Sequence, residues 1–412
     1  MDTAKATAPG THDAQVITLV GIAHGTSHFF HLILAPLFPW LKDAFELSYS
    51  ELGLLMTVFF VVSGVGQALG GFVVDRKGAL PVLMAGVLLL AIAALGLAAS
   101  QSYLSLMIFA GVAGLGNSVF HPADFTLLNK RVSTPRLGHA FSMHGVMGTA
   151  GWAIAPIFLA GLSSLFHWRV ALLAAAALAT VVLMLLVAYR DTLEPIKVRT
   201  AVPHTKTEGT GSHSLAFLSL TSVWMIFGFF FVTAIALGGI QIFAPSALRE
   251  IYGISAAAAS MSITVYMTAS ALGLLSGGFL AARTQHHENI VAGALATSGI
   301  LAMLLSTGWF NTGVVVFVLA LVGFGNGIAG PSRDLMVRAA APRGATGRVY
   351  GVVYSGLDVG LAIAPLMFGA MMDTHHPGGL FIGIGVFLLV AVTTALRVGV
   401  RRPRSSVQPA TG

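Results

Sequence analysis

Gly151-Trp-Ala-Ile-Ala-Pro156 and Gly360-Leu-Ala-Ile-Ala-Pro365 are two copies of one short element, 209 residues apart. Other residues align at the same separation without a gap: Gly114, Gly116 and Asn117 with Gly323, Gly325 and Asn326, Pro122 with Pro331, and Gly138 with Gly347. Small residues line many helix contacts, so glycine and alanine matches alone are weak evidence. Because the register has no gap and both prolines match, we interpret the pattern as a duplicated unit of about half the chain.

The composition of the chain indicates that lipid is the solvent for much of its surface. Hydrophobic residues make up 56% of the 412 residues, charged residues only 9%, and the mean hydropathy is +0.86. Soluble domains carry roughly 25% charged residues. A soluble protein so poor in charge has too little polar surface to face water, so the sequence predicts an integral membrane protein.

Twelve apolar segments are long enough to cross a bilayer as helices, which takes about 20 residues each. Their limits are 16–40, 50–74, 79–99, 103–128, 137–164, 168–189, 215–243, 255–282, 289–308, 313–337, 346–371 and 378–398. The runs do not alternate as barrel strands do. We predict an all-α membrane protein of twelve transmembrane helices in two pseudo-symmetric six-helix bundles. The bundles are 1–189 and 215–412, joined by a polar cytoplasmic linker at 190–214.

The basic residues predict the orientation of the chain. If both termini lie in the cytoplasm, the only basic residues on the opposite side of the membrane are Lys42, Arg169 and Arg249. Positive charge collects on the cytoplasmic side of membrane proteins. We therefore predict a multi-pass protein of the inner (plasma) membrane with both termini cytoplasmic. This bias explains the pI of about 9.9 without a nucleic-acid partner, and the absence of cysteine excludes disulfides and thiolate metal sites.

The segment between the second and third spans, Gly70-Gly-Phe-Val-Val-Asp-Arg-Lys-Gly78, carries a recognisable motif. Gly71, Asp75, Arg76 and Gly78 resemble the loop signature of the major facilitator superfamily of secondary transporters. That resemblance implies a gating role for these residues at the cytoplasmic ends of the helices. It also implies a small-molecule substrate, alternating access, and a central cavity lined by the first, fourth, seventh and tenth helices.

A narrower resemblance covers the fourth and fifth spans. The stretches Gly114-Leu-Gly-Asn-Ser-Val-Phe-His-Pro-Ala-Asp124 and Gly138-His-Ala-Phe-Ser-Met-His-Gly145 resemble the fosmidomycin-resistance branch of the superfamily. The resemblance implies export of a small phosphonate antibiotic in exchange for protons. Two features depart from drug antiporters: Ala155 replaces a glycine before Pro156, and Phe109-Ala-Gly lacks a basic residue.

Ionisable side chains within the spans are the candidate site residues, because each costs about 2.5–3.5 kcal/mol at the centre of a membrane helix. His24, His28 and His31 are spaced four and three residues apart, which places them on one helical face. Such a face can exchange protons, bind an anion when charged, or ligate a metal. Hydrogen bonding between helices is the structural alternative.

Span four holds His121 and Asp124 around Pro122, where we expect a kink. Asp124 aligns with Arg333 in the repeat, and Asp334 follows it. One hypothesis is a charged element at the cytoplasmic mouth, formed or broken as the halves rock. Direct binding of an anionic substrate by Arg333 and a static ion pair are the alternatives.

Asp358 in span eleven and His144 in span five are further candidate proton carriers. The sequence contains no nucleotide-binding loop and no enzyme motif, so we expect neither an enzyme nor a cofactor. The leading hypothesis is a monomeric, proton-coupled exporter of a small anionic compound. The alternatives are an uptake carrier for an organic anion or metal complex, and a membrane receptor that moves nothing.

Overall fold

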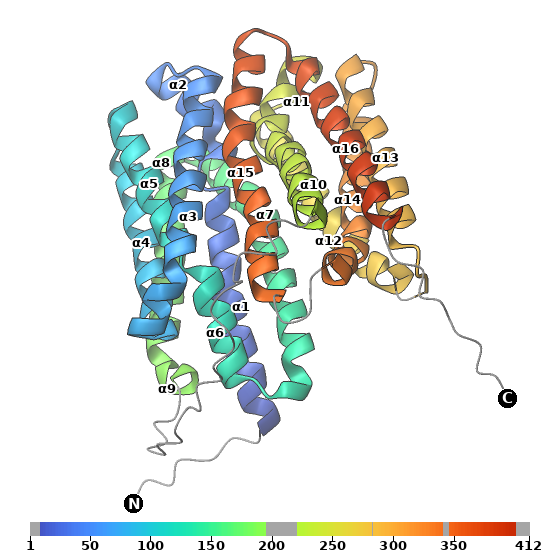
Figure 1. Ribbon diagram of the computed structural model, residues 1–412. Coiled ribbons are helices and arrows are strands. Elements are labelled where there is room, and N and C mark those ends of the chain that lie inside the picture. The colour runs from blue at the N-terminus through green and yellow to red at the C-terminus, as the bar shows by residue number, and fades with distance from the viewer. Residues whose placement is uncertain (1–8, 195–220, 282, 341–345, 401–412) are drawn as a thin grey trace, which may run out of the picture.

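The computed structural model describes residues 9–194, 221–281, 283–340 and 346–400. Twelve helical segments of these ranges are long and apolar enough to cross a membrane. Helix α1 begins and helix α16 ends at the same end of the bundle (Figure 1), as an even number of crossings requires. The twelve-span prediction and the all-helical fold class are confirmed.

The N-terminal half contains α1 (Pro9–His31), α2 (Phe38–Phe45), α3 (Tyr49–Lys77), α4 (Ala79–Ala99), α5 (Tyr103–Asn117), α6 (Phe120–Arg131), α7 (Leu137–Leu165), α8 (Trp168–Ala188) and the short α9 (Arg190–Leu193). The C-terminal half contains α10 (Thr221–Gly238), α11 (Ala244–Tyr252), α12 (Ala256–Ala281), α13 (His287–Leu304), α14 (Thr312–Ala340), α15 (Thr346–Asp373) and α16 (Pro377–Val400). The first and seventh spans are each built from two helices in succession, α1 with α2 and α10 with α11.

The structure corrects the predicted limit of the seventh span. This span runs on to Tyr252 rather than ending at 243, because a five-residue π-helical turn (Gly239–Phe243) leads directly into α11. The fourth span breaks between α5 and α6, next to Pro122, where the sequence predicts a kink. Pro122 lies in the first turn of α6, where backbone N–H groups have no partner within the helix, so its missing donor costs little.

The two halves make equivalent internal contacts. Gly114 of α5 meets the backbone of α3 at Phe59, and Gly323 of α14 meets the backbone of α12 at Tyr266. In both pairs a β-carbon on the glycine would collide with a carbonyl group of the facing helix. The duplicated glycines therefore set the same close approach between the second and fourth spans of each half.

The halves meet along two seams, α3 against α15 and α7 against α12. Hydrogen bonds cross these seams: Thr57 Oγ1 donates to the carbonyl of Ala362 (2.9 Å), and Thr264 Oγ1 donates to the carbonyl of Ala153 (2.7 Å). Helices α2 and α11 lie at one end of the bundle, whereas α1 begins and α16 ends at the other (Figure 1). We call the α2–α11 end the loop end.

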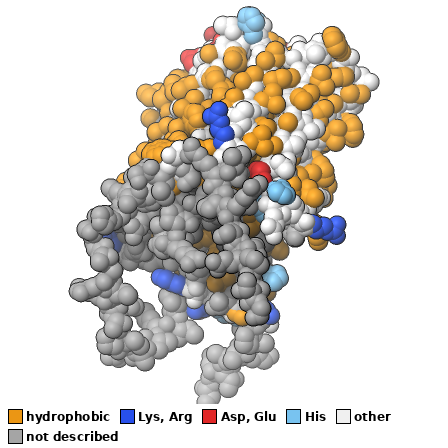
Figure 2. Space-filling view, turned by 45° about the vertical axis from the view of Figure 1, so that its right-hand side comes forward, with side chains coloured by type: hydrophobic (Ala, Val, Ile, Leu, Met, Phe, Trp, Pro, Cys, Tyr) orange, Lys and Arg blue, Asp and Glu red, His pale blue; other side chains and the backbone are white. Residues whose placement is uncertain are grey.

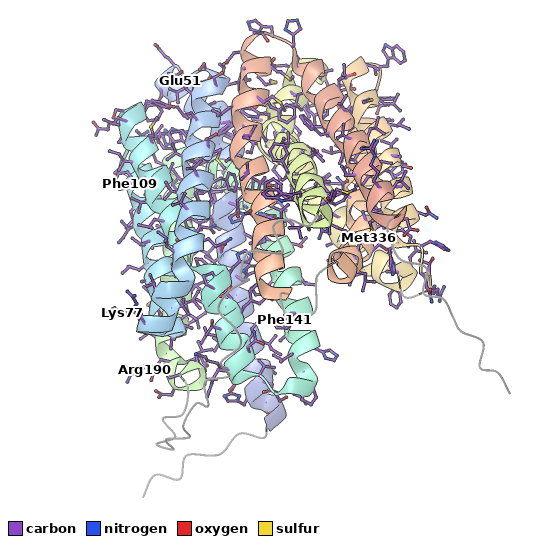
Figure 3. The ribbon with its side chains drawn as sticks, viewed as in Figure 1. Glu51, Lys77, Phe109, Phe141, Arg190 and Met336 are labelled. Carbon is purple, nitrogen blue, oxygen red and sulfur yellow. The ribbon has the colours of Figure 1, made fainter. Side chains whose placement is uncertain are left out.

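Charged side chains sit mainly near the two ends of the bundle. Glu51 lies at the loop end, and Lys77 and Arg190 lie at the opposite end (Figure 3). Hydrophobic side chains cover most of the described face in Figure 2. Exposed Leu, Ile, Val and Phe residues occur on helices of both halves, for example Leu104, Ile154 and Phe317. Such a broad apolar surface fits a protein solvated by acyl chains.

Candidate functional site

A buried carboxylate lies at the centre of the N-terminal half. The Asp124 side chain is fully buried, and its Oδ2 accepts hydrogen bonds from His24 Nδ1 (3.0 Å) and His144 Nε2 (3.2 Å). These residues belong to α6, α1 and α7, and both histidines are buried as well. Two histidine donors compensate a charge that is costly in an apolar interior. Asp124, His24 and His144 are thus brought together as one polar cluster.

The histidines predicted on one helical face do lie side by side. The ring centroids of His24 and His28 are 4.4 Å apart, and those of His28 and His31 are 4.9 Å apart. His144 stacks on His24 from the facing helix at 3.4 Å. Gly148 of α7 makes this packing possible, because a β-carbon there would lie only 2.8 Å from the His28 ring.

His121 completes the cluster from α6. Its ring centroid lies 5.3 Å from that of His24 and 6.2 Å from that of His144, and the ring is edge-on to both. His28, His31 and His121 are partly exposed, whereas His24, His144 and Asp124 are buried. The cluster therefore has an accessible row and a buried row behind it. We refer to these six residues as the histidine cluster.

An aromatic wall borders the cluster. The ring centroid of Trp152, on α7, lies 4.3 Å from that of His28 and 5.9 Å from that of His31. Phe59 and Phe60 of α3 lie edge-on to the His31 ring. The Nδ1 atom of His28 and both ring nitrogens of His31 are buried without a hydrogen-bond partner. No sequence pattern marks Trp152 as a site residue, because a single tryptophan carries none. Each imidazole nitrogen is able to donate or accept one hydrogen bond, and these three do neither among the described residues.

A chain of polar side chains that the sequence did not reveal connects α1, which carries three residues of the histidine cluster, to two other helices. Ser27 Oγ donates to Asn117 Oδ1 (2.5 Å), and Asn117 Nδ2 donates to Ser63 Oγ (2.8 Å), joining α1, α5 and α3. In the other half, Asn326 Nδ2 donates to the hydroxyl of Tyr266 (2.7 Å). Asn117 and Asn326 are matched in the repeat, and that match was the signal for an equivalent structural role.

The expected pairing of Asp124 with Arg333 is not formed in this conformation. Asp124 Oδ2 is held by histidines of its own half, and Oδ1 has no hydrogen-bond partner. Arg333 of α14 instead lies over the Phe230 ring of α10, with 5.0 Å between the guanidinium carbon and the ring centroid. The Asp334 side chain lies outside the described residues.

Asp358 lies apart from the histidine cluster, on the seam between the halves. It sits on α15 facing Gly64 of α3, where a β-carbon on the glycine would be 3.4 Å from the Asp358 β-carbon. It forms no ion pair with another described residue. A carboxylate at this place therefore lies in the contact between the two halves.

The predicted gating motif lies at the end of α3 opposite the loop end. Arg76 and Lys77 occupy the last turn of α3, where positive charge is favourable. Gly78 is the single residue between α3 and α4, and its φ of 90° explains why glycine stands there. Gly71 has open space where a side chain would be. The Asp75 side chain lies outside the described residues, so its gating role stays a prediction.

Comparison with known proteins identifies relatives over nearly the whole chain. The profile of the Major Facilitator Superfamily matches residues 20–332 and, in a second match, residues 226–412. The uncharacterized MFS-type transporter YfnC of Bacillus subtilis is 27% identical over 374 residues, which cover 89% of this chain and 88% of that protein. The cis,cis-muconate transport protein of Acinetobacter baylyi is 24% identical over 382 residues, covering 86% and 87%.

The narrower branch is matched only in part. The fosmidomycin resistance protein of Escherichia coli is 25% identical over 152 residues, which cover 35% of this chain and 36% of that protein. Among solved structures, a bacterial homologue of the human lysosomal transporter Spinster, in an inward-facing and occupied conformation, has a TM-score of 0.75 at 14% identity. It covers 94% of this chain and 95% of that one, a likeness of fold.

Proposed function

This chain belongs to the Major Facilitator Superfamily, and we propose that it is a proton-coupled exporter of a small anionic compound, working by alternating access. It crosses the membrane twelve times and carries a small molecule. We further propose that it works as a monomer in the plasma membrane with both termini in the cytoplasm, as the distribution of Lys and Arg favours. The loop end then faces outward.

The observation that carries the proton-coupling proposal is Asp358 on the moving seam. Alternating access requires α3 and α15 to separate at one end and close at the other. A membrane carboxylate without a cationic partner costs less to move when it carries a proton. Protonation of Asp358 would therefore favour close packing against Gly64, and loss of the proton would favour opening to water.

An anionic cargo is supported by the cationic and imidazole groups inside the fold. Arg333 on α14 and the accessible row of the histidine cluster on α1 and α6 belong to the first, fourth and tenth spans. A guanidinium recognises carboxylates and phosphonates through two parallel hydrogen bonds. A relative that spans the chain is named as a carrier of muconate, a dicarboxylate.

The test is transport by purified protein reconstituted in liposomes, with cis,cis-muconate and fosmidomycin as probes. We expect an imposed pH gradient to drive accumulation of one probe, and Asp358→Asn to reduce gradient-driven flux at least tenfold while exchange without a gradient survives. Asp191→Asn is the matched control, because its carboxylate is almost fully exposed on α9. Flux of a transported probe that ignores the pH gradient would overturn the coupling.

Direction is the second question, and an uptake carrier for organic anions is the alternative, because the name of the muconate relative states no direction. Cells that express the protein separate the two. An exporter lowers the cellular content of the probe relative to cells with the Asp358→Asn variant, and an uptake carrier raises it. Higher accumulation in cells with the unmodified protein would replace export by uptake.

A further inference from the structure

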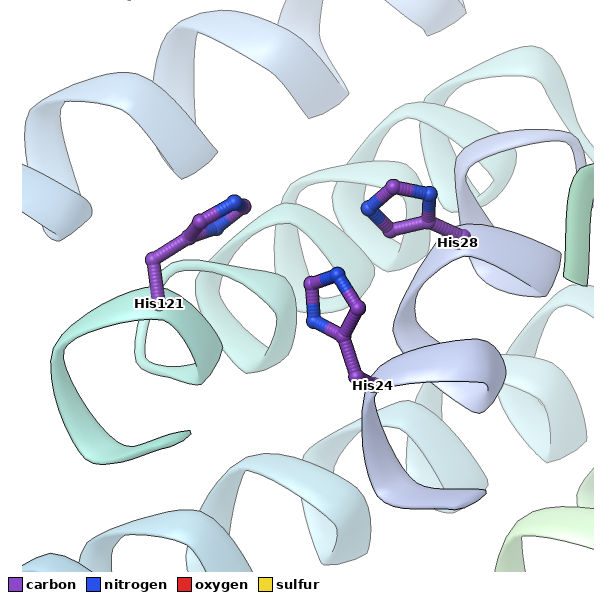
Figure 4. A group of neighbouring side chains, drawn as sticks. All are labelled: His24, His28 and His121. Carbon is purple, nitrogen blue, oxygen red and sulfur yellow. The ribbon is translucent and has the colours of Figure 1, made fainter. Parts of the chain in front are cut away.

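Three imidazoles in the histidine cluster converge from two helices. One nitrogen each of His24, His28 and His121 lies within 4.8 Å of the other two. Figure 4 shows the three rings facing one another, His24 and His28 from successive turns of α1 and His121 from the start of α6. Tetrahedral zinc with Zn–N bonds of 2.0–2.1 Å places ligand nitrogens about 3.4 Å apart. The nitrogens lie up to 4.8 Å apart in this structure, so binding requires the side chains to rotate towards one another.

The orientation of His24 is fixed from behind. Its Nδ1 donates to Asp124 Oδ2, which leaves Nε2 on the far side of the ring, directed towards His28 and His121 (Figure 4). A carboxylate that holds the second nitrogen of a histidine is the usual support of a histidine metal ligand. His144 donates to the same oxygen and steadies the carboxylate. The outer support of a metal site is therefore already assembled.

The exposure of the side chains favours His24, His28 and His121 over a second set of possible metal ligands. His24, Asp124 and His144 also bring ligand atoms within 4.8 Å, but all three are buried and already hydrogen-bonded to one another. His28 and His121 are partly exposed, whereas no member of the second set is. The Nδ1 atom of His28 is buried beside Gly148, and the other nitrogen of the ring is directed towards His24 and His121 (Figure 4).

We propose that His24, His28 and His121 bind one divalent transition-metal ion, with a fourth position open to water or an anion. Neutral imidazole suits Zn²⁺, Co²⁺, Ni²⁺ and Cu²⁺, whereas Mg²⁺ and Ca²⁺ prefer oxygen ligands. The site lies wholly within the N-terminal half, so it does not depend on Asp358 or on the position of the other half. The metal-site proposal can therefore be refuted without refuting the proposed proton coupling, and the reverse is also true.

The test uses the full chain, purified in detergent, stripped with chelator and freed of any histidine tag. Calorimetry with Zn²⁺ is expected to show one ion per chain, and Co²⁺ is expected to give the intense visible absorption of a four-coordinate nitrogen site. His28→Ala should weaken Zn²⁺ binding at least 100-fold, and Asp124→Asn, which removes only the outer support, about 10–100-fold. Mg²⁺ should not compete.

The matched control is His139→Ala, an exposed histidine near the start of α7 in the same half. It should leave both the affinity and the Co²⁺ spectrum unchanged. Melting temperature in chelator is measured for every variant, so that loss of fold is separated from loss of the site. The absence of a Co²⁺ spectrum in the unmodified protein, or tight Zn²⁺ binding retained by a folded His24→Ala, His28→Ala double variant, overturns the proposal.

Discussion

Replacement of Asp373 should open the loop end. The carboxylate of Asp373, the last residue of α15, accepts hydrogen bonds from the backbone N–H groups of Tyr49 (2.6 Å) and Ser50 (2.8 Å). These groups belong to the first turn of α3, in the other half, where helix N–H groups have no partner of their own. Ser48 caps the helix through Glu51, so Asp373 supplies what the cap leaves unpaired.

The magnitude follows from the two hydrogen bonds. Hydrogen bonds to a charged group contribute about 1.5–3 kcal/mol each, and attraction to a helix N-terminus adds about 0.3–1 kcal/mol. Asp373 is partly exposed and water replaces lost partners, so we discount the total to about 2 kcal/mol. That free energy corresponds to a shift of about 30-fold in the ratio of closed to open loop ends.

The assay exploits the absence of native cysteine. Spin labels on Asp43→Cys of α2 and His376→Cys, which follows α15, report the separation of the halves by pulsed electron resonance; both native side chains are exposed. We expect Asp373→Ala to add a population at longer distance, and Asp373→Asn to give a smaller one. Thr374→Ala is the control, because its hydroxyl bonds only within its own segment. A folded Asp373→Ala protein with the parent distance distribution would refute the reasoning.

Three further substitutions test the packing around the site. Gly53→Ala places a β-carbon against the carbonyl of Pro365 on the α3–α15 seam, so we expect the same labels to report loss of loop-end closure and transport to fall at least tenfold. Gly151→Ala collides with the backbone of Gly25 on α1, and a drop in melting temperature with weakened Zn²⁺ binding is expected; unchanged values would contradict the contact. Asn117→Ala leaves two buried hydroxyl groups without their partner at a cost of about 2–4 kcal/mol, to be measured as a lowered midpoint of denaturation.

The sequence predicted the fold because the fold is set by quantities that the sequence displays directly. Span length, charge bias and the matched glycines follow from bilayer thickness and from close helix contacts. The site was predictable only where neighbours lie on one helix, as with His24, His28 and His31. The contact of Asp124 with His24 and His144 joins residues 100 and 20 positions apart, and no local pattern encodes it.

The repeat suggests a pair that is not formed in this conformation, for a physical reason. It aligns Asp124 with Arg333, and opposite charges at equivalent places suggest a pair across the axis. Duplication, however, fixes only the backbone contacts of each bundle, such as those of Gly114 and Gly323, and leaves the side chains that do not pack there free to differ. The N-terminal half satisfies its carboxylate internally with two histidines.

This asymmetry bears on how the two halves divide their tasks. A carboxylate compensated within its own bundle does not need the other half, so under the proposed alternating access we expect the histidine cluster to keep its geometry. Asp358 has no such compensation and lies on the seam between the halves. The surroundings of a residue that couples protonation to conformation must differ between the two conformations. A binding site that releases its ligand when it becomes exposed to water can keep the same surroundings. Conformational coupling is therefore better placed at the seam, and ligand recognition inside the bundles.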